Sequence, residues 1–111
     1  MEKPVKGDVV VLPFPFSDLS ASKKRPALVV ATLKGEDVIL CQITSQARSD
    51  EYSIILAESD FKEGSLHVTS RIRPNRLFTA DKSIILYKAG LLKEKKIKEV
   101  EEAIVKIFRN I

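Results

Sequence analysis

The chain has 111 residues, of which 44% are hydrophobic and 31% are charged, and its formal net charge is +4. This length and composition indicate one globular domain with a core of its own and argue against wholesale disorder. No apolar run is long enough to span a membrane and no charged-then-apolar leader opens the chain, so we expect a cytoplasmic protein.

The first half of the chain is predicted to form strands. A β-branched run at residues 9–12 is the first strand, which should end or lie at an edge because Pro13 and Pro15 interrupt the ladder. Strands at 27–32 and 38–43 follow, and the second of these is apolar almost throughout, so it should be central. The only cysteine, Cys41, lies in this strand; it excludes an intramolecular disulfide and should be a buried, unreactive thiol.

The second half adds shorter strands and one helix. Strands are predicted at 52–56, 66–73, 77–79 and 83–87, with a loop containing a helical turn at 58–64 and a chain-reversing turn at Pro74-Asn75. Residues 66–73 alternate, which predicts a half-buried strand with a polar, cationic outer face. Apolar residues at i, i+3 and i+7 spacing then predict an amphipathic helix at about 93–109.

These elements predict a mainly β (α+β) fold: a small, strongly bent β-barrel of six or seven short strands, covered by the C-terminal helix. A barrel would remove the exposed edges that so many short strands leave. We expect a single domain, 1–111, with the barrel at about 6–90.

Two basic windows in this chain contain no acidic residue. Residues 19–35 hold four basic side chains, and residues 64–80 hold three arginines and His67. They predict one polyanion-binding surface assembled from two segments, although chance clustering is the alternative. Pro26 restricts Arg25 to an extended backbone at the mouth of a strand, which suits a guanidinium that grips a phosphate; the alternative is a solvated basic turn.

Five segments in order resemble the MazF/PemK toxins of type II toxin–antitoxin systems. They are GDVVVLPFPFSDL at 7–19, KRPALVV at 24–30, QITSQ at 42–46, SRIRP at 70–74 and LFTADKS at 77–83. The resemblance covers about residues 6–108. It implies an SH3-like barrel with a C-terminal helix, usually a homodimer, whose partner is an acidic antitoxin protein.

The resemblance also implies an activity and its residues. These toxins are metal-independent endoribonucleases, with no cofactor, that cut single-stranded RNA such as mRNA at short sequences. Their catalytic residues fall on Arg25, Thr44 and Arg73 of this chain. Some relatives carry an aspartate, proposed as the base, where this chain has Asn75, and its first loop offers only Asp18.

Cleavage without a metal requires attack by the neighbouring 2′-OH, neutralisation of charge on the phosphate oxygens, and proton transfer. Arginine matches two phosphate oxygens and Thr44 can donate one hydrogen bond. The proton acceptor stays open between His67, Asp18, water and the RNA. Further RNA contacts are expected from Lys23, Lys24, Ser45, Gln46, Ser70, Arg71, Asn75 and Arg76. Phe14, Phe16 and Phe78 are expected either to stack on bases or to pack in the core.

Two other functions fit the same residues. One is a non-enzymatic inhibitor of DNA gyrase, because the CcdB toxins share this barrel. The other is a nucleic-acid-binding barrel that has lost its activity.

Overall fold

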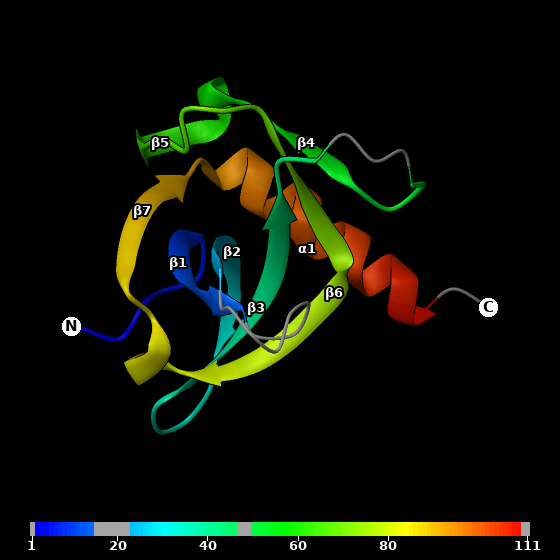
Figure 1. Ribbon diagram of the computed structural model, residues 1–111. Coiled ribbons are helices and arrows are strands. Elements are labelled where there is room, and N and C mark those ends of the chain that lie inside the picture. The colour runs from blue at the N-terminus through cyan, green and yellow to red at the C-terminus, as the bar shows by residue number, and fades with distance from the viewer. Residues whose placement is uncertain (1, 15–22, 47–49, 110–111) are drawn as a thin grey trace.

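The computed structural model describes residues 2–14, 23–46 and 50–109 as one curled antiparallel sheet and one long helix (Figure 1). The elements in chain order are β1 (Asp8–Phe14), β2 (Lys23–Thr32), β3 (Asp37–Thr44), β4 (Ile54–Leu56), a 3-10 turn (Glu58–Asp60), β5 (Phe61–Gly64), β6 (Ser70–Asp81), a second 3-10 turn (Lys82–Ile84), β7 (Tyr87–Leu92) and α1 (Glu94–Arg109). The predicted fold class is therefore confirmed.

The sheet has the strand order β4-β6-β3-β2-β1-β7-β5. Over the described residues it curls into a half-barrel whose edges are β4 and β5, so the predicted barrel is an open one. These edge strands have three and four residues, and such short edges limit the backbone available for pairing with another chain. No helix within the described ranges is long and apolar enough to cross a membrane.

Both faces of the sheet are buried, which explains why β1 and β3 are apolar almost throughout. Successive side chains of a strand point to opposite faces. One apolar cluster contains Val9, Leu28, Cys41, Ile43 and Ile72, and the other contains Val10, Leu12, Ala27, Val29 and Leu40.

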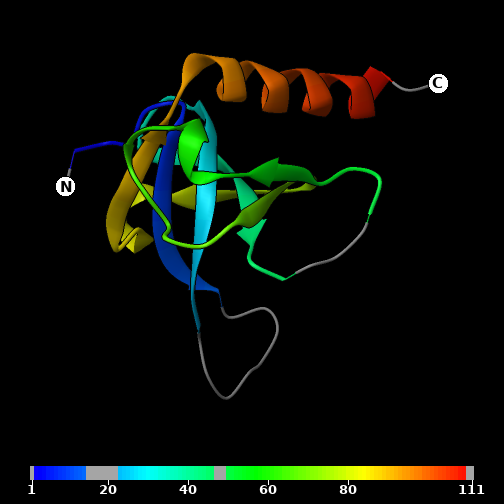
Figure 2. The same ribbon diagram turned by 90° about the horizontal axis from the view of Figure 1, so that it is seen from above.

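Helix α1 covers the face of the first cluster (Figure 2). Val100 is fully buried there, and Ile97 and Ile104 pack beside it. These are the positions that the helical periodicity predicted.

Cys41 is fully buried, as predicted. Its Sγ donates a hydrogen bond to the carbonyl oxygen of Arg73 at 2.9 Å. Burial raises the pKa of the thiol from an ordinary value of 9.0 to about 12.

The predicted start of the second strand is wrong, because β2 begins at Lys23 and contains Arg25. The cause is pairing with β1, which reaches Leu12↔Arg25 and Phe14↔Lys23. Strand β1 also runs through Pro13. At that point β1 has passed its last pair with β7, at Val11, and a proline is tolerated where a strand has lost one neighbour.

The predicted start of the strand at 66–73 is also wrong, and so is the turn predicted after it. Strand β6 begins only at Ser70, because His67 has a left-handed backbone (φ 63°) that turns the chain. β6 then continues through Pro74-Asn75 and absorbs the short strand expected at 77–79. The four residues Arg73–Arg76 lie opposite the single residue Gln42. The proline therefore sits in a wide bulge of a continuous strand rather than in a chain reversal.

The remaining differences concern short elements. The strand expected at 52–56 begins at Ile54, and the loop expected at 58–64 contains β5. Residues 83–86 are not a strand: Asp81 Oδ1 accepts a hydrogen bond from the Ser83 N–H at 2.8 Å and caps a 3-10 turn, after which β7 begins at Tyr87. Pairing with distant strands creates β5 and β7, so local sequence carries little signal for them.

Candidate functional site

A groove of about 280 Å³ lies where β3 ends and where β2, β6 and β7 begin. Its lining residues are Val11, Lys24, Arg25, Pro26, Ile43, Thr44, Ser45, Leu66, Val68, Ser70 and Tyr87. Arg25 and Thr44, which are 19 positions apart in the sequence, therefore border the same space.

Strand register explains how Arg25 and Thr44 meet. The β2–β3 ladder ends at the pair Ala27 and Gln42, and the same register continued by two residues would set Arg25 opposite Thr44. The β3–β6 ladder pairs Thr44 with Arg71. These three residues form a row on one face of three adjacent strands. With about 4.8 Å between neighbouring strands, the Cα atoms of Arg25 and Arg71 are roughly 10 Å apart.

The Thr44 hydroxyl is held in place at the end of β3. The residue is 8% exposed, and its Oγ1 accepts a hydrogen bond from the Gln46 N–H at 3.1 Å. This local turn fixes the position of the oxygen and leaves its own hydrogen to be donated to a ligand.

The groove is electrostatically positive. Lys24 and Arg25 border it, and none of the described residues that line it carries a carboxylate. Within the part of the chain that the structure describes, none of Lys24, Arg25 and Arg71 has an ion-pair partner. An anion with several oxygen atoms is the ligand that such a site suits.

The sequence profile of PemK-like, MazF-like toxins of type II toxin–antitoxin systems matches residues 5–108. The chain belongs to this family. No curated protein sequence matches the chain at a significant level.

Solved structures of the same fold agree with this assignment. A mycobacterial endoribonuclease in complex with its cognate antitoxin has a TM-score of 0.76 at 15% identity, over 97% of each chain. MazF from Deinococcus radiodurans has a TM-score of 0.75 at 20% identity, over 97% of this chain and 98% of its own. A MazE–MazF structure from the same organism has a TM-score of 0.75 at 19% identity, over 96% of each chain. At these identities the likeness establishes the fold of the toxin.

Arg73, the third residue predicted to be catalytic, is not among the residues that line the groove of the toxin. Its Nη2 lies 3.6 Å from Oδ2 of Asp50, and its side chain is only 13% exposed. Oδ1 of Asp50 accepts hydrogen bonds from the backbone N–H groups of Tyr52 (2.8 Å) and Ser53 (2.7 Å). These two donors, and then Arg73 and Arg71, lower the pKa of Asp50. Arg73 therefore ties β6 to the segment before β4.

The other predicted residues divide into two groups. Lys24, Ser45 and Ser70 line the groove of the toxin, whereas Lys23, Gln46, His67, Arg71, Asn75 and Arg76 do not. His67 is exposed between two lining residues. Asp18 and Phe16 lie outside the described residues. Phe14 and Phe78 pack edge to face, with ring centroids 5.1 Å apart, beside the second apolar cluster, so both belong to the core.

Sequence reasoning missed the apolar wall of the groove in the toxin. Tyr87, Leu66 and Val68 line it, and Tyr87 and Val68 are more than half exposed. Nothing in the local sequence relates Tyr87 to Arg25; only the pairing of β7 with β1 and of β1 with β2 does so.

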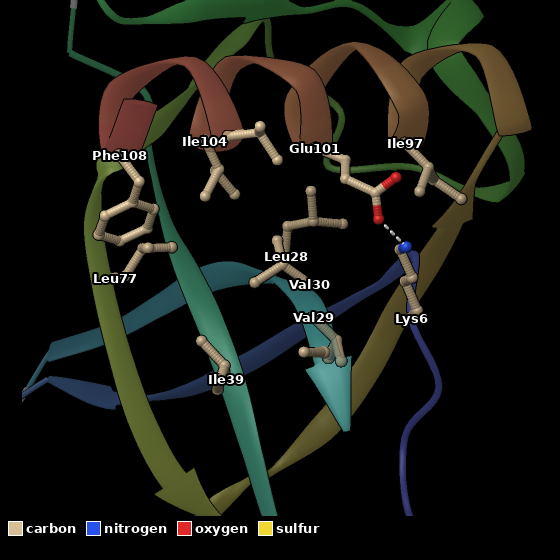
Figure 3. Close-up of a pocket in the computed structure, with 12 residues that line it drawn as sticks. Lys6, Leu28, Val29, Val30, Ile39, Leu77, Ile97, Glu101, Ile104 and Phe108 are labelled. Atoms are coloured by element: carbon tan, nitrogen blue, oxygen red, sulfur yellow. Dashed lines mark hydrogen bonds and ion pairs between the residues drawn. The ribbon is translucent and has the colours of Figure 1, made fainter. Parts of the chain in front are cut away.

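A second cavity, of about 260 Å³, lies between α1 and the sheet (Figure 3). Its walls are mainly apolar, with Leu28 and Val30 facing Ile104 and Phe108, and an ion pair between Lys6 and Glu101 stands at one end. None of the predicted site residues that the structure describes lines it.

Proposed function

We propose that this toxin is a sequence-specific endoribonuclease that cleaves single-stranded RNA by attack of the 2′-OH, without a metal ion. The observation that carries the proposal is the meeting of Arg25 and Thr44 in one groove that, among the described residues, no carboxylate lines. The names of the mycobacterial endoribonucleases that share the fold support the same class of activity.

Arg25 and Thr44 act on the scissile phosphate. The guanidinium of Arg25 presents two parallel N–H donors to the non-bridging oxygens, where negative charge grows as the 2′-OH attacks. The Thr44 hydroxyl donates to the same group from a fixed position. Both side chains come from paired strands, so they need little rearrangement when RNA binds.

A second cation completes the phosphate grip, and we assign this part to Arg71. Arg71 lies directly across from Thr44, and its guanidinium has no ion-pair partner among the described residues. The catalytic part predicted for Arg73 stays a prediction. It requires the contact with Asp50 to open, whereas Arg71 requires no such change.

As the 2′-oxygen bonds to phosphorus, the P–O5′ bond breaks. The proton of the attacking 2′-OH goes to water or to the RNA itself, and the leaving 5′-oxygen takes a proton from water. Arg25 stays protonated and Thr44 is a poor base, and the lining residues within 2–14, 23–46 and 50–109 include no imidazole and no carboxylate. His67 would have to swing in from beside Val68 to take this part, and Asp18 would have to come from the segment outside the described residues.

The same groove suits an acidic protein partner. Solved relatives carry a cognate antitoxin, and an acidic antitoxin segment would compete with RNA for Lys24, Arg25 and Arg71. We also expect the toxin to form a homodimer, as the family resemblance implies.

Cleavage of a long RNA of known sequence in EDTA, with mapping of the 5′ ends, tests the proposal. We expect cuts at one short sequence, and Arg25→Ala or Thr44→Val should each lower the rate by about 10²- to 10³-fold. Thr44→Ser keeps the hydroxyl and should retain activity, and Lys34→Ala, on the β2–β3 turn, controls for loss of one positive charge.

Two results would contradict the proposal. RNA binding without any products would indicate a barrel that has lost its activity. Inhibition of DNA supercoiling by gyrase, with RNA left intact, would indicate the CcdB-like alternative.

A further inference from the structure

Tyr87 stands at the edge of the groove and takes no part in the core. It is the first residue of β7, is 53% exposed and belongs to neither apolar cluster. It pairs with Val11, and Val11 pairs with Pro26. Residues paired across strands share a face, so these three residues form a row across β7, β1 and β2, and all three line the groove.

The groove combines two chemistries. One part presents Arg25 and the Thr44 hydroxyl, and the other presents the Tyr87 ring beside Val68, which is 59% exposed. Two strand spacings, roughly 10 Å, separate the Cα of Tyr87 from that of Pro26. Pro26 shares its face of β2 with Lys24, and both Lys24 and Arg25 line the groove. A ligand that fills both parts joins an anionic group to a flat apolar one across this distance.

We propose that Tyr87 is a stacking platform for an unpaired RNA base next to the phosphate that Arg25 holds. The inference rests on the proposed function, because it takes single-stranded RNA as the ligand. A base needs only a π-face to stack on an aromatic ring, and such stacking accounts for much of the affinity in single-strand binding sites. More than half of the Tyr87 surface is exposed, so its ring is accessible to a ligand.

The chain allows a direct optical test, because it has two tyrosines and no tryptophan. Tyr52→Phe leaves Tyr87 as the only tyrosine, and Tyr87→Phe leaves Tyr52, which lies outside the groove. The probe is a short single-stranded RNA of mixed sequence with 2′-O-methyl riboses, which cannot be cleaved. We expect it to quench tyrosine emission in Tyr52→Phe and to leave emission unchanged in Tyr87→Phe. The same backbone without bases should not quench either variant.

Affinity measurements separate stacking from charge. Tyr87→Ala should raise Kd for the probe at least about fivefold, whereas Tyr87→Phe keeps the ring and should retain most of the affinity. The slope of log Kd against log salt should not change in Tyr87→Ala, because no phosphate contact is lost. In cleavage assays Tyr87→Ala should raise KM with little change in kcat.

Three results would overturn the inference. The first is an unchanged Kd in Tyr87→Ala, and the second is a loss of affinity in Tyr87→Phe as large as that in Tyr87→Ala. The third is quenching by polyglutamate but not by the RNA probe, which would mean that the ring binds an acidic protein segment. Failure of the proposed function is distinguishable. If the probe quenches Tyr87 emission but the wild-type protein leaves ordinary RNA intact, the stacking site is supported and the proposed nuclease activity is refuted.

Discussion

Arg71 and Arg73 are two residues apart on β6, yet their surroundings indicate different roles. Replacing each of them with alanine tests this difference in role. Arg71 lies opposite Thr44 with no ion-pair partner among the described residues, whereas Arg73 contacts Asp50 and is mostly buried. We predict that Arg71→Ala weakens RNA binding directly and that Arg73→Ala mainly affects the fold.

The two substitutions should change different quantities: Arg71→Ala should change RNA affinity, and Arg73→Ala should change thermal stability. A hydrogen bond to a charged group contributes about 1.5–3 kcal/mol, so Arg71→Ala should raise Kd about 10- to 150-fold. It should also reduce the slope of log Kd against log salt by about 0.7, the value for one phosphate contact on a single strand. Arg73→Ala should leave that slope unchanged. It should lower Tm by roughly 5 °C, because a mostly buried side chain is lost.

The assay is fluorescence anisotropy with the non-cleavable RNA at several salt concentrations, together with thermal unfolding. Lys34→Ala, which removes a charge on the β2–β3 turn, is the matched control and should change neither quantity much. The reasoning is refuted if Arg73→Ala flattens the salt dependence at unchanged Tm while Arg71→Ala binds like the wild type. In that case Arg73 would leave Asp50 to bind the phosphate, as the family resemblance suggests.

Three further predictions concern the fold. Gly64→Ala should destabilise the protein far more than Gly35→Ala: both glycines have positive φ, but a Cβ at Gly64 would lie 2.1 Å from the Ala89 carbonyl oxygen, whereas one at Gly35 meets nothing within 4 Å. Chemical denaturation of the two variants measures the difference, and equal losses would mean that the backbones of β5 and β7 are not in close contact. Val100→Ala should cost about 2 kcal/mol, since Val100 is the residue of α1 that is fully buried against the sheet; a loss below the error of the same titration would argue against this packing. Cys41 has its pKa raised to about 12, so it should resist iodoacetamide at pH 8 until the protein unfolds. As pH rises, the thiol of the unfolded chain loses its proton before that of the folded protein. The stability that the buried thiol contributes is therefore complete below about pH 9 and is lost between about pH 9 and pH 12. The free energy of unfolding should fall less over this range in Cys41→Ala.

The central strands and the helix could be predicted because each carries its own local pattern. β-Branched runs marked β1, β2 and β3, and apolar residues at helical spacing marked α1. The weaker predictions lie where pairing with a distant strand overrides local preference. Pro74-Asn75 has the composition of a turn, yet it becomes a bulge because both flanks of the segment pair with β3.

For the candidate site too, some residues could be predicted from local sequence and others could not. Arg25 and Thr44 could be named from the sequence because short motifs surround them, and the excess of positive charge near them is local. The surroundings of Arg73 and the position of Tyr87 could not be named. Asp50 meets Arg73, and Tyr87 meets Val11, only through the register of strands far apart along the chain.

The sequence by itself determined the fold class, the family resemblance and the residue types available for holding a phosphate. Periodicity and short motifs are properties of neighbouring residues, and the unfolded chain already contains them. Only the tertiary structure decided which cations stay unpaired and which aromatic ring borders the groove. The physical reason is that a shift in strand register by one residue sends every side chain of that strand to the opposite face, and no short segment of this chain encodes that register alone.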